Sequence, residues 1–182
     1  MTYSDTLLLP PGSYLAVNLA WGAGVFFGII IAGGVSGAHM NPAVTVAMAA
    51  HGRLQWRLVL PYVVAQCVGA LLASATIYVE YRSALFDYGA KCCNGTTFSI
   101  PPNGPCNAAS VWTTFPQAFE STGDGMFDQI LGTGLLLLCI FAVGDDAQRR
   151  PALDASPFAK AGAVGALVVT IGMCFGDPLP LC

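Results

Sequence analysis

Long stretches without a formal charge constrain this chain more than any other feature of its sequence. The longest covers residues 6–52, in which His39 and His51 are the only side chains that ionise near neutral pH. Three others cover residues 58–79, 129–144 and 161–176. A helix that crosses the hydrocarbon core of a bilayer needs about 20 mostly apolar residues. The last two stretches are a little short, but a flanking residue such as Lys160 can reach back to the membrane surface.

Composition excludes a soluble domain. Charged residues make up 9% of the chain and hydrophobic residues 55%, whereas a soluble domain carries about 25% charged residues. The net charge of −3 gives no reason to expect a nucleic-acid partner. Residues 1–12 hold no Lys or Arg and therefore do not resemble a signal peptide. We expect an all-α, multi-pass protein of the lipid bilayer.

Four stretches are predicted to be transmembrane helices: residues 14–31, 58–81, 127–143 and 158–175. Small residues four apart recur in them, such as Gly24 and Gly28 in the first and Ala65 and Gly69 in the second. This spacing lets two helix backbones approach closely in lipid. The pattern indicates tight helix packing and does not point to a particular function.

The distribution of basic residues predicts the orientation in the membrane. Arg53 and Arg57 lie between the first two predicted helices, and the connection between the last two is also basic. The long connection at residues 82–126 has only Arg82 and Lys91. Because Lys and Arg concentrate on the cytoplasmic side, we expect the two short connections inside the cell and the long loop outside.

The predicted outer loop carries two candidate modification sites. Asn94 begins an Asn-Gly-Thr tripeptide, which is a glycosylation acceptor if the loop faces the lumen. In an oxidising exterior, Cys92 or Cys93 could form a disulfide with Cys106. The alternative is that all seven cysteines of the chain are free.

The segment between the first two predicted helices reads AGGVSGAHMNPAVTVAMAAHG. Asn41 suits the position before a helix, and Pro42 suits its first turn. The apolar residues 43–50 that follow would span only about 12 Å as a helix. Residues 33–38 are too rich in glycine to be predicted as helix, and non-helical backbone persists at membrane depth only inside protein or beside a water-filled cavity. The sequence therefore predicts a re-entrant loop and a half-helix whose N-terminus points at a pore.

Such a helix end favours uncharged, hydrogen-bonding solutes. Its unpaired N–H groups carry about half a positive charge, which opposes cations and protons. The Asn41 side chain can cap these groups with its oxygen and keep its NH₂ free as a neutral donor. The predicted pore-lining acceptors are the carbonyls of Gly37, Ala38, His39 and Met40. A row of acceptors opposite a donor suits water or a polyol.

The stretch SGAHMNPAVTVA resembles the first signature loop of the aquaporin family, whose members read Ser-Gly-Ala-His-hydrophobic-Asn-Pro-Ala. Eight residues in register are specific, whereas Asn-Pro-Ala alone would not be. The resemblance extends over residues 14–176 through the segments WGAGVFFGIIIAGG, LPYVVAQCVGALLASATIY, FDQILGTGLLLLCIFAVGD and AVGALVVTIGMCFG. It implies a passive channel rather than an enzyme, without metal or cofactor, in which Asn41, Pro42 and Ala43 form the pore motif.

Three features resemble the glycerol-conducting branch of that family. Trp21 lies twenty residues before Asn41, where the resemblance implies the aromatic wall of the selectivity filter. The Asp128-Gln129 pair at the start of the third predicted helix and the long outer loop also look like that branch. The implied solutes are glycerol and water, with urea as a further candidate. The alternative for Trp21 is an anchor at the membrane surface.

Two polar side chains within the predicted membrane region have competing interpretations. His39 is expected to be a packed, hydrogen-bonded imidazole, because no Cys, Asp or Glu stands at metal-ligand spacing beside it. Gln66 is expected to support the re-entrant loop by bonding to its backbone, and a contact between helices is the alternative. Neither residue is expected to take part in catalysis.

The chain departs from the family pattern at both ends. The expected organisation is a lead of residues 1–12, a partial aquaporin-like domain of residues 13–176, and a divergent end of residues 177–182. The first span and the second Asn-Pro-Ala half of the family are missing from this pattern, so conduction by the chain alone is not expected.

Three functions compete on this basis. The first is a partial form of a glycerol and water channel in the plasma membrane, tetrameric if it follows the family. The second is a non-conducting partner that assembles with full-length channels and modulates them. The third, a membrane redox protein that uses Cys92, Cys93 and Cys106, lacks a cofactor-binding motif or a base paired with the cysteines.

Overall fold

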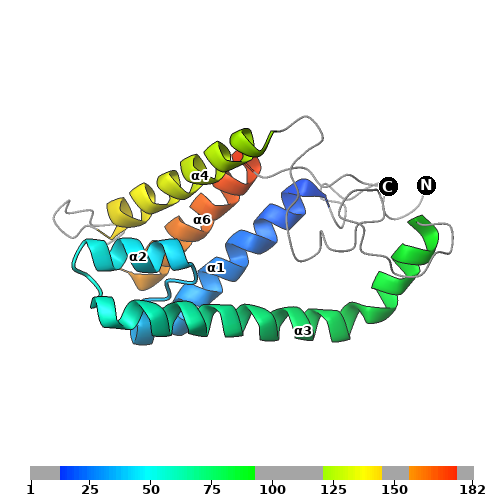
Figure 1. The fold of residues 1–182 in the computed structure, drawn as a ribbon, viewed down its shortest axis with the longest axis horizontal. Coiled ribbons are helices and arrows are strands. Elements are labelled where there is room, and N and C mark those ends of the chain that lie inside the picture. The colour runs from blue at the N-terminus through cyan, green and yellow to red at the C-terminus, as the bar shows by residue number, and fades with distance from the viewer. Residues whose placement is uncertain (1–12, 93–120, 145–155, 176–182) are drawn as a thin grey trace.

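The computed structural model describes residues 13–92, 121–144 and 156–175, and all regular structure in these residues is helical (Figure 1). The elements are α1 (Tyr14–Ser36), α2 (Pro42–Ala50), a short 3₁₀ turn η2 (Trp56–Leu58), α3 (Val59–Cys92), α4 (Thr122–Val143) and α6 (Pro157–Phe175). Four of these segments are long and apolar enough to span a membrane. The prediction of an all-α membrane protein with four transmembrane helices and one half-helix is confirmed.

Two helices extend beyond their predicted ends. Helix α1 continues to Ser36 and includes Gly33 and Gly34, which we expected to lie in the loop. The expectation was wrong because a helix pairs its own backbone groups in an apolar medium, and the Gly33 carbonyl still accepts from the Gly37 N–H at 3.1 Å. Helix α3 continues to Cys92, into residues that we assigned to the outer loop.

Helix α4 begins five residues before the predicted start at Phe127, at Thr122. The cause is a capping box. The Ser121 hydroxyl accepts from the Asp124 N–H at 3.2 Å, and the Asp124 carboxylate accepts from the Ser121 N–H at 3.1 Å. These bonds satisfy two backbone donors that a helix start would otherwise leave unpaired.

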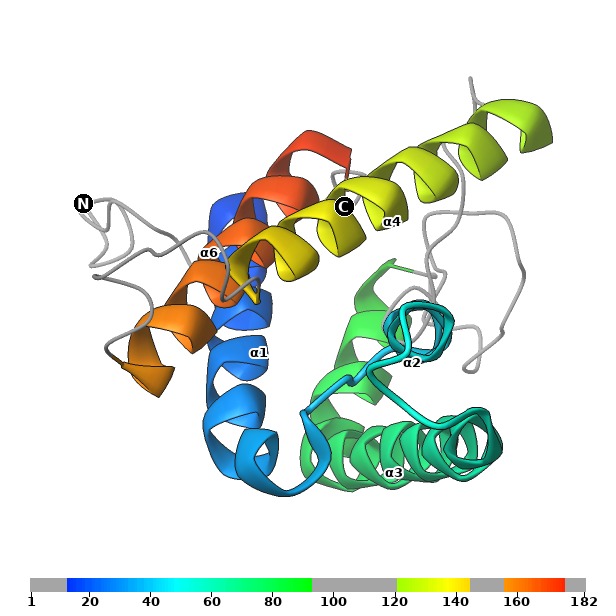
Figure 2. The same cartoon turned by 90° about the vertical axis from the view of Figure 1, so that its left-hand side faces the viewer.

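Helices α1 and α6 lie side by side, and their contact is the most extensive between two helices in the described residues (Figures 1 and 2). A Cβ atom added to Gly22 would lie 2.7 Å from the Gly165 carbonyl oxygen, and one added to Gly165 would lie 2.8 Å from that of Gly22. Both glycines are buried. Only residues without a side chain permit this approach, as in other close helix pairs in lipid.

The same contact contains polar groups near the start of α1. Asn18 is only 5% exposed, and its Nδ2 donates to the Tyr14 carbonyl at 2.9 Å. Its Oδ1 lies against Gly172, where no side chain could fit. The Tyr14 hydroxyl donates to the Gly172 carbonyl across the two helices. Hydrogen bonds of this kind add to helix association in a membrane, where water cannot compete for them.

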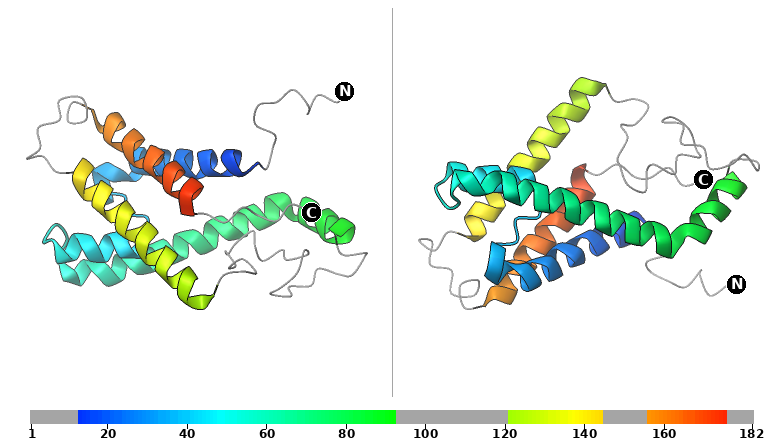
Figure 3. Two further views of the ribbon diagram at one scale, coloured as in Figure 1. Left: turned by 90° about the horizontal axis from the view of Figure 1, so that it is seen from above. Right: turned by 60° about the horizontal axis from the view of Figure 1, so that its bottom comes forward.

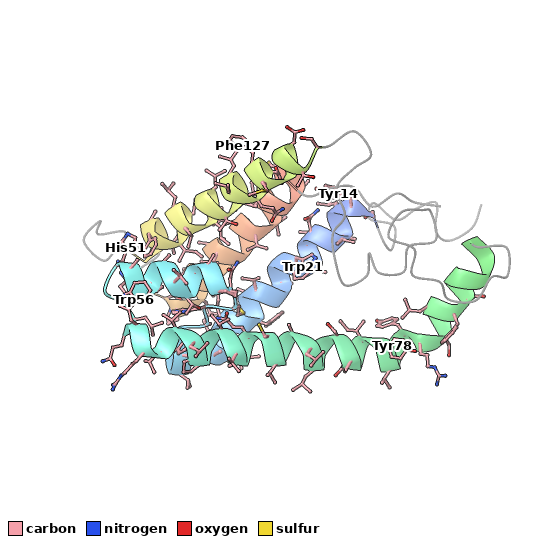
Figure 4. All side chains as sticks on the ribbon, in the orientation of Figure 1. Tyr14, Trp21, His51, Trp56, Tyr78 and Phe127 are labelled. Atoms are coloured by element: carbon pink, nitrogen blue, oxygen red, sulfur yellow. The ribbon has the colours of Figure 1, made fainter. Side chains whose placement is uncertain are left out.

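The connection between α2 and α3 is attached to the end of α4. Arg53 donates from Nη1 to the Gly144 carbonyl at 3.3 Å, and its guanidinium lies 5.5 Å from the centre of the Phe141 ring. The His51 ring lies 4.3 Å from that of Phe141. The connection between α2 and α3 and the C-terminal end of α4 are therefore at one end of the molecule, the end that carries His51 and Trp56 in Figure 4.

Most of the outer surface of the helices is apolar and uncovered. In α3, Leu60 is 70% exposed and Val79 is 75% exposed, and this helix extends well past the others (Figure 3). A soluble protein would not leave so much apolar surface in water. The surface suits lipid or further protein within the bilayer, and the protein is a multi-pass membrane protein.

The close α1–α6 contact yields a testable prediction. Gly22→Val should lower the free energy of unfolding by about 1–3 kcal/mol, the usual effect of overpacking, because the new side chain meets the Gly165 backbone. The matched control is Gly24→Val, whose Cβ would meet nothing within 4 Å. The measurement is the apparent Tm of the purified chain in detergent. Equal Tm values for the two variants would contradict the observed packing.

Candidate functional site

The loop between α1 and α2 has an unusual backbone. Gly37, Ala38 and Met40 have φ angles of 77°, 48° and 47°, which lie in the left-handed region that most side chains avoid. Gly37 ends α1 by donating its N–H to Gly33. The carbonyls of residues 37–40 accept no hydrogen bond from the part of the chain that the structure describes. Within the described residues, the loop thus carries four successive carbonyls without a hydrogen-bond partner, and their role as pore-lining acceptors stays a prediction.

Asn41 caps α2 in the manner that its sequence predicts. Its Oδ1 accepts from the Ala43 N–H at 2.8 Å, and Pro42 occupies the first helical position. Within the described residues no acceptor takes the Nδ2 protons of Asn41. Its amide is therefore available as a neutral donor next to the four carbonyls.

Helix α2 is a half-helix of 9 residues, which corresponds to about 13.5 Å along its axis. It lies beside the beginning of α3 (Figure 2). Val44, Thr45 and Ala49 are its buried residues. The N-terminal end, with its partial positive charge, is at Asn41, and the other end joins the connection that Arg53 attaches to α4.

Thr45 joins three polar groups beneath the loop and is fully buried. Its hydroxyl lies 3.1 Å from the Asn41 carbonyl and 3.2 Å from His39 Nδ1. Gln66 on α3 donates to the same hydroxyl from Nε2 at 2.9 Å. We expected Gln66 to bond to the loop backbone, but the structure places its amide on the side chain of α2. The Thr45 hydroxyl accepts the Gln66 hydrogen bond in place of the loop backbone.

Tyr62 lies on α3, one turn before Gln66, and its side chain contacts the end of α1. Its hydroxyl donates to the Ser36 carbonyl at 3.0 Å, and its ring lies 5.1 Å from that of His39. His39 is therefore a packed, hydrogen-bonded imidazole in this structure. Among the described residues, no three His, Cys, Asp or Glu side chains are arranged to hold a metal ion.

Trp21 is on α1 and is 67% exposed (Figure 4). Gly28, seven residues later, is on the same face of the helix, and a Cβ atom added there would lie 2.5 Å from the Met40 sulfur. The face that carries Trp21 is thus the face on which the loop packs. The separation of the two positions along the helix is about 10.5 Å.

Other predicted residues lie away from this site. Asp128 and Gln129 line a pocket of about 210 Å³ between α4 and α6. Asn94, Cys93 and Cys106 are outside the described residues, and Cys92 ends α3. Cys67, Cys139 and Cys174, the cysteines within the spans, are free.

Sequence reasoning missed Thr45 and Tyr62. A usable signal was present for both. Thr45 is the single polar side chain in α2, and a lone hydroxyl at membrane depth requires partners. Tyr62 stands four residues before Gln66, which places the two on one face of a helix.

Comparison with known proteins identifies relatives over most of the chain. Residues 2–178 match the family described as "Major intrinsic protein". The chain is 37% identical to aquaporin-10 of Milnesium tardigradum over 91% of its length, and 34% identical to aquaporin-7 of Mus musculus over 91%. It is 33% identical to an aquaglycerol porin of Saccharomyces cerevisiae, again over 91%.

The match covers 38%, 51% and 24% of these three relatives, respectively, so the chain spans about half of their length or less. The family match nevertheless includes every helix that the structure describes. The loop geometry, the capped half-helix and these similarities agree, and the chain belongs to the major intrinsic protein family.

Proposed function

We propose that this chain provides one wall of a passive transmembrane channel for glycerol, water and other small uncharged solutes. The observation that carries the proposal is the junction at Asn41. An amide donor and a positive helix end stand there beside four carbonyls, and neither the amide N–H groups nor these carbonyls have a hydrogen-bond partner among the described residues. No titratable group or bound cofactor is needed for such a pathway, because solute crosses by exchanging hydrogen bonds.

The chemistry of this junction favours polyols and water over ions. A solute hydroxyl both donates and accepts, so it can bond to the loop carbonyls and to Asn41 Nδ2. A cation would gain the carbonyls but would meet the partial positive charge at the start of α2. An anion would meet carbonyl oxygens of like polarity. The combination selects neutral molecules that offer hydroxyl groups.

The position of Trp21 supports glycerol as a solute. A surface anchor needs only to be near the end of its helix, but Trp21 also shares the α1 face on which Met40 packs. Its exposed ring would present an apolar surface about 10.5 Å along α1 from that contact. A glycerol molecule has an apolar carbon side and a hydroxyl side, which fits a ring on one wall and carbonyls on another.

A chimera tests the proposal directly. Residues 14–175 replace the segment that they match in the Saccharomyces cerevisiae aquaglycerol porin, and glycerol-driven reswelling of vesicles is followed by light scattering. We expect reswelling faster than that of empty vesicles and approaching the unmodified host. The same assay on the 182-residue chain alone shows whether the pore needs the segments that the host supplies. A folded, inserted chimera without flux would contradict the proposal.

Asn41→Asp should abolish most glycerol flux in the chimera. The carboxylate can still cap α2, but it replaces a neutral donor with a negative acceptor beside four carbonyls. We expect flux to fall at least tenfold, which corresponds to about 1.4 kcal/mol, with a cation leak measured by dye quenching. The control is Gln129→Glu, which makes the same amide-to-carboxylate change at a position away from the loop. Normal glycerol flux without a leak would contradict the role of Asn41.

Trp21→Ala should widen the path and reduce its selectivity. Removing the indole deletes the apolar wall, so the ratio of glycerol flux to that of bulkier polyols should fall. Trp56→Ala is the matched control, because Trp56 is similarly exposed, at 63%, but is at the end of the molecule where α2 meets α3. An unchanged ratio in Trp21→Ala would make Trp21 a surface anchor and remove the support for glycerol.

A further inference from the structure

We propose that Thr45 is a positioning residue that fixes the His39 imidazole in the tautomer protonated at Nδ1. The other ring nitrogen, Nε2, is then held as a lone-pair acceptor beside Gly37. The inference goes beyond the proposed transport function and does not depend on it, because it rests on contacts among α2, α3 and the loop.

The argument begins with the number of protons available. A threonine hydroxyl has one proton and two lone pairs. Three groups contact the Thr45 hydroxyl within 3.2 Å: the Asn41 carbonyl, Gln66 Nε2 and His39 Nδ1. Thr45 is fully buried, so water does not supply a fourth partner. All three groups share this single hydroxyl, and the Asn41 carbonyl also accepts from the Thr45 backbone N–H at 3.1 Å.

Only one arrangement of protons makes all three contacts hydrogen bonds. The Asn41 carbonyl accepts and cannot donate, so the single Thr45 proton points to it. Gln66 Nε2 donates to one lone pair. His39 Nδ1 must then donate to the other, which requires a proton on Nδ1. A neutral imidazole carries one such proton, so Nε2 is left bare.

The conclusion does not depend on how the Gln66 amide is oriented. Amide oxygen and nitrogen are assigned from their surroundings, and the Gln66 Oε1 is buried without a partner. If the amide is turned over, Oε1 and the Asn41 carbonyl both face the Thr45 hydroxyl, and one of these two oxygens takes its proton. The Thr45 hydroxyl then still has no proton for His39, and Nδ1 still donates.

The surroundings restrict rotation of the ring. One face is against Tyr62, with the ring centres 5.1 Å apart. The Nε2 atom lies 3.3 Å from the place that a Cβ atom on Gly37 would occupy. The Nε2 acceptor is therefore beside the left-handed residue that begins the row of free carbonyls, and it adds a side-chain acceptor to that row.

Nitrogen NMR tests the tautomer. The chain contains only two histidines, so a His51→Asn variant assigns the ring signals of ¹⁵N-labelled His39 in the full chain in lipid nanodiscs. At a pH where the ring is neutral, we expect the proton on Nδ1 and a pyridine-type Nε2. A proton on Nε2 would overturn the proposal, and this measurement needs no change at Thr45.

Two substitutions test the role of Thr45 itself. Thr45→Ser keeps the hydroxyl and should keep the Nδ1-protonated form, whereas Thr45→Val removes it and should move the proton partly or wholly to Nε2. Thr76→Val is the control, because the Thr76 hydroxyl also bonds to a carbonyl four residues earlier but is far from His39. An unchanged tautomer in folded Thr45→Val would show that another group sets it. Loss of the Nδ1 form in Thr45→Ser would also contradict the proposal.

Discussion

The structure depends on one constraint: a backbone polar group at membrane depth must find a partner within the protein or beside water. The four long helices meet it with their own hydrogen bonds. The loop from Gly37 to Met40 does not, since its carbonyls accept nothing from the described residues. Four unpaired acceptors would be unfavourable in lipid by several kcal/mol each. The proposed path for hydroxyl-bearing molecules would supply the missing hydrogen-bond partners at this loop.

The sequence predicts the helices and the half-helix well, because both follow from local chemistry. Charge-free length determines the spans, and Asn41 with Pro42 determines the start of α2. The ends of the helices were predicted less well. Gly33 and Gly34 were read as helix breakers, although glycine in a membrane helix loses little when its hydrogen bonds have no water to compete with them. In α3, no Gly or Pro lies between residue 81 and Gly89, so the polar side chains after residue 81 were an unreliable marker of the helix end.

The sequence predicted the backbone features of the candidate site but not the side-chain contacts that hold the loop in place. The Asn41 cap and the free carbonyls could be read from a short motif. The hydroxyl of Thr45 could not be placed, because its partners are His39, six residues away, and Gln66, 21 residues away on another helix. Contacts between elements depend on how α2 lies against α3, which neither periodicity nor propensity specifies. The same limit explains why Gln66 was assigned to the loop backbone rather than to Thr45.

Helix α1 connects the parts of the site through two different faces. One face carries Asn18 and Gly22 and is held against α6 at backbone contact. Another carries Trp21 and Gly28, and Met40 of the loop packs on it. A helix fixed on one side by glycine contact and interhelical hydrogen bonds cannot rotate without breaking them. The α1–α6 contact therefore fixes the direction in which α1 presents Trp21 and the face on which Met40 packs, although α6 contributes no residue to the site.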